Sequence, residues 1–258
     1  QFFTAKPEMM AYAAKRADVL GFDGVDINMG CPDRTIEHQG AGACLIKTPE
    51  LARELIRAAQ DASPLPVSVK TRIGFNKESL QEWLPALFEA KPAAITLHLR
   101  TRKEMSLVSA QWELMKRAVA MRDELAPDVL LIGNGDAKDL DDAKAKAAET
   151  GCDGVMIGRG MFGNPWLFEE LGFGGLRKSS ADVGLTKSKH GLDEKLTALV
   201  ALARAFEQLS PPKSFHILKK HIKAFVAGFD GAAELRASLM EAENAAELER
   251  TIRQMASV

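Results

Sequence analysis

Short apolar segments alternate with amphipathic helical segments along the first two thirds of the chain. The apolar segments predict six strands, at about residues 1–3, 24–28, 66–70, 93–98, 128–134 and 153–158. The intervening segments predict helices at about 7–20, from Pro49 with Thr48 as N-cap, from Lys77, and at about 111–125 and 138–149. We interpret the strands as continuously apolar rather than alternating, which indicates a parallel sheet covered on both faces.

The strand–helix repetition leaves two main folds, a doubly wound sheet and a (β/α)8 barrel. Residues capable of chemistry follow five successive strands: Cys31, Lys70, His98, Asn134 and Arg159. A barrel collects its site from the ends of many strands, whereas a doubly wound sheet binds mainly at one switch point. We therefore predict an α/β fold, a (β/α)8 TIM barrel that lacks its first two strands.

The remainder of the chain has a different pattern. Residues 172–191 are rich in Gly, Ser and Lys without strong periodicity, which predicts a linker after a barrel domain at 1–171 that is incomplete at its N-terminus. Residues 192–258 predict a small helical bundle. One helical face carries Leu192, Leu196, Leu199, Ala203 and Phe206, and a second helix follows the break at 210–212.

Composition narrows the class of protein. The 258 residues carry a net charge of -1, so any nucleic-acid surface must be local. Three cysteines, none in a C-x-x-C pair, favour a reducing, cytoplasmic compartment, and no metal site is expected. The sequence contains no run of 18 apolar residues, so no membrane span is predicted. The chain starts without Met, at residues typical of mid-strand, which indicates a fragment.

Two glycine-containing turns follow the last two predicted strands, "IGNGD" at 132–136 and "IGRG" at 157–160. Small residues let backbone N–H groups approach an anion, and Arg159 could add a bidentate contact. Loops after the seventh and eighth strands of barrels commonly hold a phosphate. Two ordinary tight turns are the alternative.

Three further residues are candidates for chemistry. Lys70 ends a strand in "VKTR", where burial requires a polar or anionic partner, and a structural ion pair is its alternative. His98 ends the next strand, although a lone histidine is more often structural. Cys31 follows a strand within Gly-Cys-Pro. Since an unperturbed thiol has a pKa of about 8.5, it can act as a general acid, with a thiolate nucleophile as the alternative.

Five segments in register resemble one known family. They are "GFDGVDINMGCPDRTIEHQGAGACLI", "VSVKTRIG", "LHLRTRKE", "IGNGD" and "DGVMIGRGMFGNPWLF", and "LKKHIKAFVAGFDGAAELR" resembles the family's helical tail. Together they are similar to the tRNA-dihydrouridine synthases. The resemblance implies a flavin-dependent barrel that reduces the C5=C6 bond of uridines in tRNA, with FMN as cofactor and NADPH as reductant.

The resemblance also implies residue roles. Cys31 would be the proton donor, and Asn28 would lie near the uracil. The residues implied to bind FMN are Gln1, Lys70, His98, Asn134, Gly135, Asp136, Gly158 and Arg159. The family's first two strands, including a flavin-contacting Pro-Met stretch, have no counterpart in this sequence.

A basic stripe predicts where tRNA binds. His216, Lys219, Lys220 and Lys223 follow helical spacing beside an apolar stripe of Phe215, Leu218, Ile222 and Phe225. We expect this stripe to contact RNA phosphates, with a merely solvated face as the alternative. Arg100, Arg102 and Lys103 extend the expected basic rim at the barrel mouth.

Two other functions remain open. An FMN-dependent oxidoreductase of a free pyrimidine, similar to a dihydroorotate dehydrogenase, would not need the basic helix. A truncated, inactive copy would bind RNA without flavin. We expect tRNA as the partner, no membrane association and no obligate protein partner.

Overall fold

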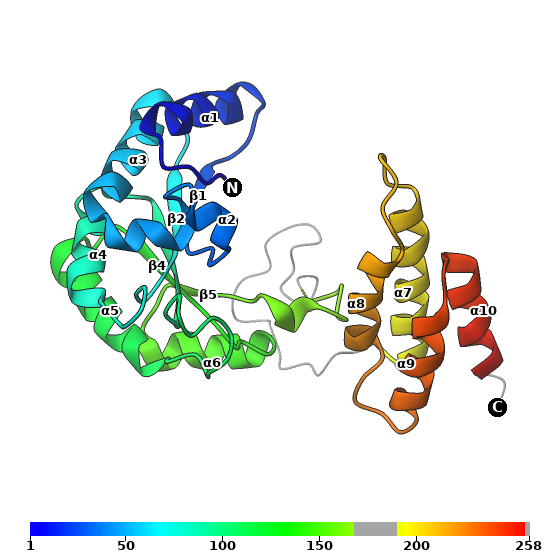
Figure 1. The fold of residues 1–258 in the computed structure, drawn as a ribbon. Helices are drawn as coiled ribbons and strands as arrows, with labels where there is room; N and C mark the ends of the chain where they lie inside the picture. The colour runs from blue at the N-terminus through cyan, green and yellow to red at the C-terminus, as the bar shows by residue number, and fades with distance from the viewer. Residues whose placement is uncertain (168–189, 256–258) are drawn as a thin grey trace. The chain divides into compact units, whose positions relative to one another are not determined.

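A computed structural model describes residues 1–167 and 190–255, and the chain divides into two compact units, Gln1–Gly158 and Arg159–Val258 (Figure 1). The domain boundary expected after residue 171 lies outside the described residues. The same holds for the linker expected at 172–191, except its last two residues. Each unit is therefore described by itself. Among the described residues, no helix is both long and apolar enough to cross a membrane.

The first unit is built on a parallel five-stranded sheet in the order β1-β2-β3-β4-β5. The strands are β1 (Val25–Met29), β2 (Val67–Arg72), β3 (Ala94–His98), β4 (Leu130–Asn134) and β5 (Gly154–Met156). The first of the six predicted strands is reduced to a single parallel bridge between Phe2 and Ile27. This order follows the sequence without the reversal that defines a doubly wound sheet, so the α/β prediction is confirmed and the barrel-type succession is favoured.

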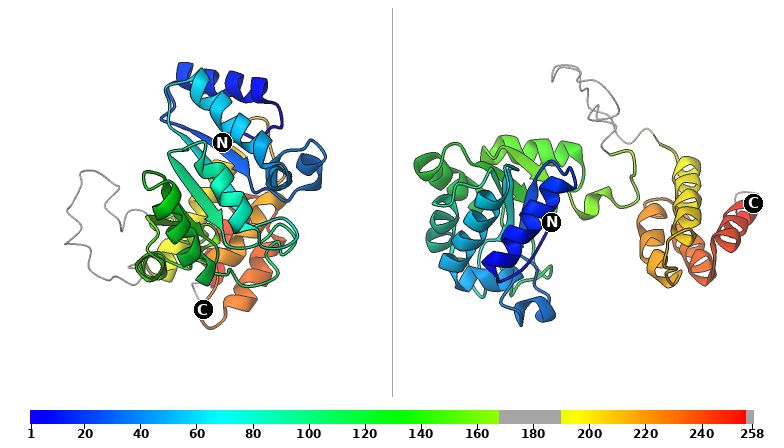
Figure 2. Two further views of the ribbon diagram at one scale, coloured as in Figure 1. Left: turned by 90° about the vertical axis from the view of Figure 1, so that its left-hand side faces the viewer. Right: turned by 90° about the horizontal axis from the view of Figure 1, so that it is seen from above.

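Helices connect the strands and cover one face of the sheet (Figures 1 and 2). They are α1 (Pro7–Val19), α3 (Pro49–Ala62), α4 (Leu80–Phe88), α5 (Glu113–Leu125) and α6 (Leu140–Thr150). In α3, Ala52, Leu55, Ile56 and Ala59 are buried at helical spacing. Thr48 occupies the N-cap position of α3, but its side chain makes no capping hydrogen bond.

The prediction that the strands are apolar on both faces is wrong. In β1, Val25, Ile27 and Met29 are buried, whereas Asp26 and Asn28 are only half-buried. The strand pairing places Asn28 beside Lys70, and Arg72 beside His98. Because side chains alternate between the faces of a strand, the helix-covered face is apolar and the opposite face is polar. The polar face contains the candidate site residues Asn28, Lys70, His98 and Asn134.

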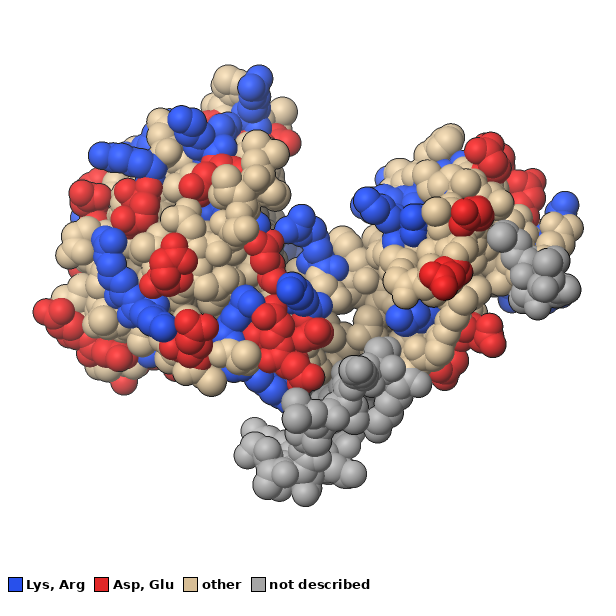
Figure 3. Space-filling view, turned by 90° about the horizontal axis from the view of Figure 1, so that it is seen from below, with Lys and Arg blue, Asp and Glu red and all other residues tan. Residues whose placement is uncertain are grey.

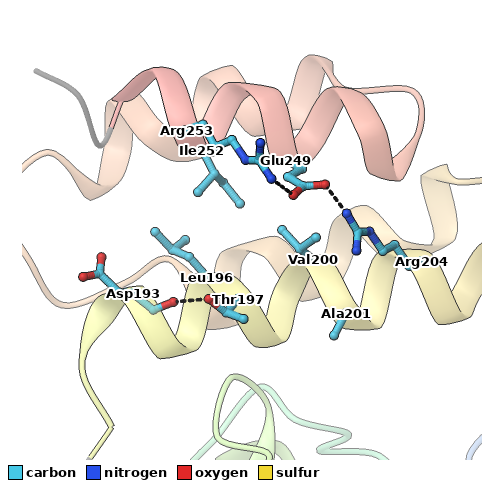
Figure 4. Close-up of a pocket in the computed structure, with 9 residues that line it drawn as sticks. All are labelled: Asp193, Leu196, Thr197, Val200, Ala201, Arg204, Glu249, Ile252 and Arg253. Carbon is cyan, nitrogen blue, oxygen red and sulfur yellow. Dashed lines mark hydrogen bonds and ion pairs between the residues drawn. The ribbon is translucent and has the colours of Figure 1, made fainter.

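The second unit contains four α-helices in its described part, α7 (Leu192–Glu207), α8 (His216–Phe225), α9 (Ala232–Glu241) and α10 (Ala245–Met255), besides a 3-10 helix at Arg159–Met161. Buried leucines and aromatic side chains form its core, among them Leu199, Ile222, Phe225, Leu239 and Leu248. A cavity of about 390 Å³ lies between α7 and α10, where Glu249 is paired with both Arg204 and Arg253 (Figure 4).

Residues 159–167 pack against α8 within this second unit. The Phe162 ring meets the His221 ring edge-on, with 5.4 Å between centroids. Gly163 has φ of 80°, and a Cβ at this position would lie 2.2 Å from the carbonyl oxygen of Ala224. Only glycine allows this backbone conformation without strain together with such a close approach.

Candidate active site

The side chain of Asn28 shapes the loop that carries Cys31. Its Oδ1 accepts hydrogen bonds from the backbone N–H groups of Gly30 at 3.1 Å and Cys31 at 2.9 Å. The carbonyl of Cys31 in turn accepts from the N–H of Ala43 at 2.9 Å. The Cys31 thiol is free and half-exposed. Asn28 therefore holds the backbone of the predicted proton donor directly after β1.

Gln1 joins the same polar group. Its side-chain Oε1 accepts a hydrogen bond from Asn28 Nδ2 at 3.1 Å, and its Nε2 donates to the Asp26 carboxylate. Ser68 Oγ also donates to Asp26, at 2.7 Å. The structure thus brings Gln1, Asn28 and the Cys31 loop together, as the expected flavin and uracil contacts require.

Lys70 is withdrawn from water without a carboxylate partner among the described residues. Its Nζ donates to Asn134 Oδ1 at 3.0 Å, and Asn134 Nδ2 donates to the carbonyl of Met156 at 2.9 Å. Burial lowers the pKa of Lys70, and the positive charge of Arg72 lowers it further. The structural ion pair considered as an alternative for Lys70 is not found in the described part of the chain. Its ammonium group is available to a polar ligand.

His98 is a neutral hydrogen-bonding group. Burial, followed by the positive charges of Arg72, Lys70 and Arg100, lowers its pKa to about 3. Nε2 of His98 lies 3.1 Å from NH1 of Arg100. Because a guanidinium group only donates, Nε2 accepts and the imidazole proton is on Nδ1. At neutral pH His98 can donate a hydrogen bond from Nδ1, but it carries no positive charge.

The expected basic rim needs correction. Arg100 is only 3% exposed, and it donates to the carbonyl of Val108 at 2.6 Å and to Asp136 at 2.5 Å. Its guanidinium fastens the loop after β3 and is not open to RNA. Arg102 forms two hydrogen bonds to Glu37, so its charge is largely compensated. Of the three rim residues, Lys103 is exposed.

In "IGNGD", close packing by neighbouring side chains leaves no room for a Cβ at either glycine. A Cβ on Gly133 would lie 2.6 Å from the Trp112 ring, and a Cβ on Gly135 would lie 2.7 Å from that of Ala110. Asp136 accepts a hydrogen bond from the Ala110 N–H at 2.9 Å, besides its pair with Arg100. These contacts favour the tight-turn alternative for this loop.

The second glycine turn has a different environment. Among the described residues other than its two chain neighbours, no atom lies within 4 Å of a Cβ built on Gly158, so this backbone is open to a ligand. Arg159 is exposed and begins the second compact unit. The predicted pairing of Arg159 with the turn at Asn134, Gly135 and Asp136 stays a prediction.

Arg72 is a site residue that the sequence analysis did not assign. It is 7% exposed and donates to the carbonyls of Gly30 at 2.7 Å, Thr101 at 3.1 Å and Met105 at 3.2 Å. It therefore ties the Cys31 loop to the loop after β3. The signal was its position two residues after Lys70 in a strand, which places both side chains on the same face.

The basic stripe on α8 is partly corrected. Lys219 is 7% exposed, and its Nζ lies 3.9 Å from a carboxylate oxygen of Glu243, so the expectation that it contacts RNA phosphate is wrong. Lys219 is buried together with its neighbours Leu218 and Ile222. His216, Lys220 and Lys223 are exposed, as a surface that binds RNA requires.

Comparison with known proteins identifies related sequences. A family model described as dihydrouridine synthase matches residues 1–258. The probable tRNA-dihydrouridine synthase of Staphylococcus epidermidis is 39% identical over 245 residues, covering 94% of this chain and 70% of the relative. The protein of the same description in Staphylococcus aureus is 39% identical over 246 residues, with the same coverage. Probable tRNA-dihydrouridine synthase 2 of Bacillus subtilis is 38% identical over 246 residues, covering 94% and 71%.

Proposed function

This chain belongs to the dihydrouridine synthase family of flavin-dependent oxidoreductases that reduce uridines in tRNA, and we propose that the polar face of its sheet performs that reaction with FMN and NADPH. The single observation that carries the proposal is the joint position of the Cys31 loop, Lys70 and His98. Cys31 follows β1, Lys70 lies in the second half of β2 and His98 ends β3, and these three strands are adjacent in the sheet.

The residues present fit a flavin ring. An isoalloxazine has carbonyl oxygens and ring nitrogens that accept hydrogen bonds, and Lys70 Nζ and His98 Nδ1 are donors withdrawn from water. Gln1 would add an amide beside them, and Arg159 and the open backbone at Gly158 are proposed to hold the phosphate. When bound, FMN supplies to uracil C6 a hydride that originates from NADPH.

Cys31 completes the reduction by supplying the proton for C5. The S–H bond breaks as the C5–H bond forms, and the thiolate that remains regains its proton from water. Asn28 and Arg72 position this acid, because each binds the backbone of the Gly30–Cys31 turn. Uridine must leave its base stack to reach the site, as other base-modifying enzymes require.

Other assignments belong to the same proposal. The sequential parallel strands are proposed to be an arc of a TIM barrel spanning the expected domain 1–171. The helices within 192–258 are proposed to bind tRNA through exposed residues of α8. A cytoplasmic location is proposed because the three cysteines are free, as is usual in a reducing compartment.

The experiment compares substrates for the flavin-loaded protein. With NADPH, dihydrouridine should appear in unmodified tRNA, as detected by mass spectrometry of the digested RNA, whereas free uracil and orotate should remain unreduced. Reduction of a free pyrimidine without reduction of tRNA would select the dihydroorotate dehydrogenase-like alternative. RNA binding without flavin absorbance or turnover would select the inactive copy.

A further inference from the structure

A cavity of about 430 Å³ lies in the first unit beside the Cys31 loop. It is formed by α2 (Arg34–Glu37), the 3-10 helix Gly42–Lys47 and the loop after β3. Its lining residues are Arg34, Glu37, His38, Cys44, Lys47 and Arg102. None of these residues is part of the polar sheet face described above.

The cavity is electropositive. Arg34, Lys47 and Arg102 carry three positive charges against the single carboxylate of Glu37, which leaves a net charge of +2 with His38 neutral. Glu37 is already committed to two hydrogen bonds with Arg102. Within the described residues, the side-chain cations of Arg34 and Lys47 have neither a hydrogen bond nor an ion pair.

The cations are held in place on their apolar sides. Lys47 Nζ lies 4.6 Å from the centroid of the Phe75 ring, and Arg102 Cζ lies 5.4 Å from the same centroid. These cation–π contacts fix the two groups near each other while leaving N–H donors for a ligand. The Phe75 ring therefore contacts two of the three cations of the cavity.

The cavity is also connected to the Cys31 loop through the chain and through hydrogen bonds. Arg34 follows Cys31 by three residues, and the Asp33 side chain fixes the start of α2 by accepting from the Thr35 N–H at 2.8 Å. On the other side, Arg72 ties the Gly30 carbonyl to the loop that contains Arg102. A ligand in the cavity would lie close along the chain to the predicted proton donor.

We propose that this cavity binds a backbone phosphate of the tRNA next to the target uridine. The inference rests on the proposed function and adds a phosphate site on the catalytic unit to the expected one on α8. Guanidinium groups suit phosphate because their donors match two oxygens at once. The binding is sequence-independent and positions the RNA strand while the uridine enters the site.

The occupant is RNA rather than a protein surface because charge dominates the lining. On the face shown in Figure 3, basic and acidic residues are interspersed over the first unit. With a net charge of -1 for the chain, a polyanion needs local positive sites of this kind. The phosphate of NADPH is the main competing occupant, and the test separates the two.

The experiment uses a double variant and a charge-matched control. Arg34→Ala with Lys47→Ala removes two cavity cations, whereas Arg57→Ala with Lys144→Ala removes two exposed cations from α3 and α6. The cavity variant should weaken tRNA binding and flatten the slope of log K against log salt by about 0.7–0.9 for each phosphate that is no longer neutralised. The control should keep the wild-type slope. Unchanged melting temperatures establish that both variants fold.

A third variant gives an effect of opposite sign. Glu37→Gln removes the one carboxylate among the described residues that line the cavity and keeps an oxygen that can accept from Arg102, so tRNA should bind more tightly. Equal salt slopes for the cavity variant and the control would overturn the proposal. A cavity variant that raises the KM for NADPH in flavin reduction but binds tRNA as wild type does would also overturn it. If wild type binds no tRNA, the proposed function fails as well, which distinguishes that result from failure of the cavity alone.

Discussion

Lys70 and Lys219 are lysines withdrawn from water in different units, and their partners differ. Lys219 lies in the helical unit with its Nζ 3.9 Å from the Glu243 carboxylate, so its charge is compensated. Lys70 lies on the sheet, where its Nζ donates to the neutral amide of Asn134 and forms no ion pair within the described residues. Burial lowers the pKa of Lys70, and the negative charge of Asp26 only partly opposes this. A charge buried beside a neutral partner costs stability, which is typical of binding sites.

The same difference extends to the regions around them. On the polar face of the sheet, Arg72 also lacks a carboxylate partner in the described part of the chain and binds three backbone carbonyls. In the helical unit, Glu249 compensates Arg204 and Arg253 (Figure 4). We infer that the sheet face is organised for a ligand, whereas the ion pairs of Glu249 in the helical unit lie at its surface and satisfy one another.

The largest expected effect is the loss of dihydrouridine formation when the predicted proton donor is removed. Cys31→Ala should lower the single-turnover rate of dihydrouridine formation about 10²–10⁴-fold, because a positioned general acid typically contributes that much. Flavin content and NADPH oxidation should be retained. Cys152→Ala is the control, since Cys152 is also free but is buried and lines neither the polar sheet face nor the cavity beside the Cys31 loop. A near-normal rate for Cys31→Ala would remove this residue from the mechanism.

Glycine substitutions test packing in both units. Gly133→Ala places a Cβ 2.6 Å from the Trp112 ring, and Gly163→Ala places one 2.2 Å from the Ala224 carbonyl oxygen. Each should lower the free energy of unfolding by about 1–3 kcal/mol through overpacking, with backbone strain added at Gly163. Gly158→Ala is the control, because its Cβ would meet no atom of the described residues within 4 Å, apart from its chain neighbours. Denaturant titration measures all three, and equal stabilities would contradict the packing account.

A smaller effect concerns RNA binding by the helical unit. Replacing both Lys220 and Lys223 with Ala should flatten the salt dependence of tRNA binding by about 0.7–0.9 in slope for each phosphate that these lysines neutralise. Lys219→Ala should leave that slope unchanged, because Lys219 is buried near Glu243. Binding titrations at several salt concentrations compare the variants. A slope that changes only with Lys219 would reverse this interpretation of α8.

The smallest expected effect concerns the protonation of His98, which should not take up a proton near neutral pH. His98 should remain neutral from pH 8 to about pH 4, because its pKa is lowered to about 3. The unfolded chain binds this proton near its ordinary pKa of about 6.5, so the contribution of His98 to stability is present above that pH and falls on acidification. NMR of the imidazole nitrogens measures the pKa directly, and His98→Asn should reduce the acid-side loss. A value near 6.5 would contradict the account.

The sequence predicts much of this arrangement because local pattern and chain order determine it. The apolar segments located β1 to β5, and the order of motifs identified Cys31, Lys70 and His98 as neighbours at strand ends. The polar face was missed, although Asp26 and Asn28 alternate with apolar residues, because short strands were interpreted as wholly apolar.

Contacts between distant segments account for the remaining differences. The roles of Gly133 and Gly135 depend on Trp112 and Ala110, which approach from another loop. Helical spacing located the buried side of α8, but it did not reveal that Lys219 would also be buried, with its Nζ near Glu243. These contacts and this burial therefore depend on strand pairing and helix packing between distant elements, which the local sequence pattern does not specify.

The most direct test of the contrast between the two units places the same substitution at both buried lysines. Lys70→Met and Lys219→Met each remove a charge and retain an apolar stem, and FMN affinity is measured by fluorescence titration of the unloaded protein. Lys70→Met should weaken binding by about tenfold or more, the scale of one charge-assisted hydrogen bond, without loss of fold stability. Lys219→Met should bind FMN as wild type does. Equal FMN affinities for the two variants would contradict the assignment of Lys70 to the flavin site.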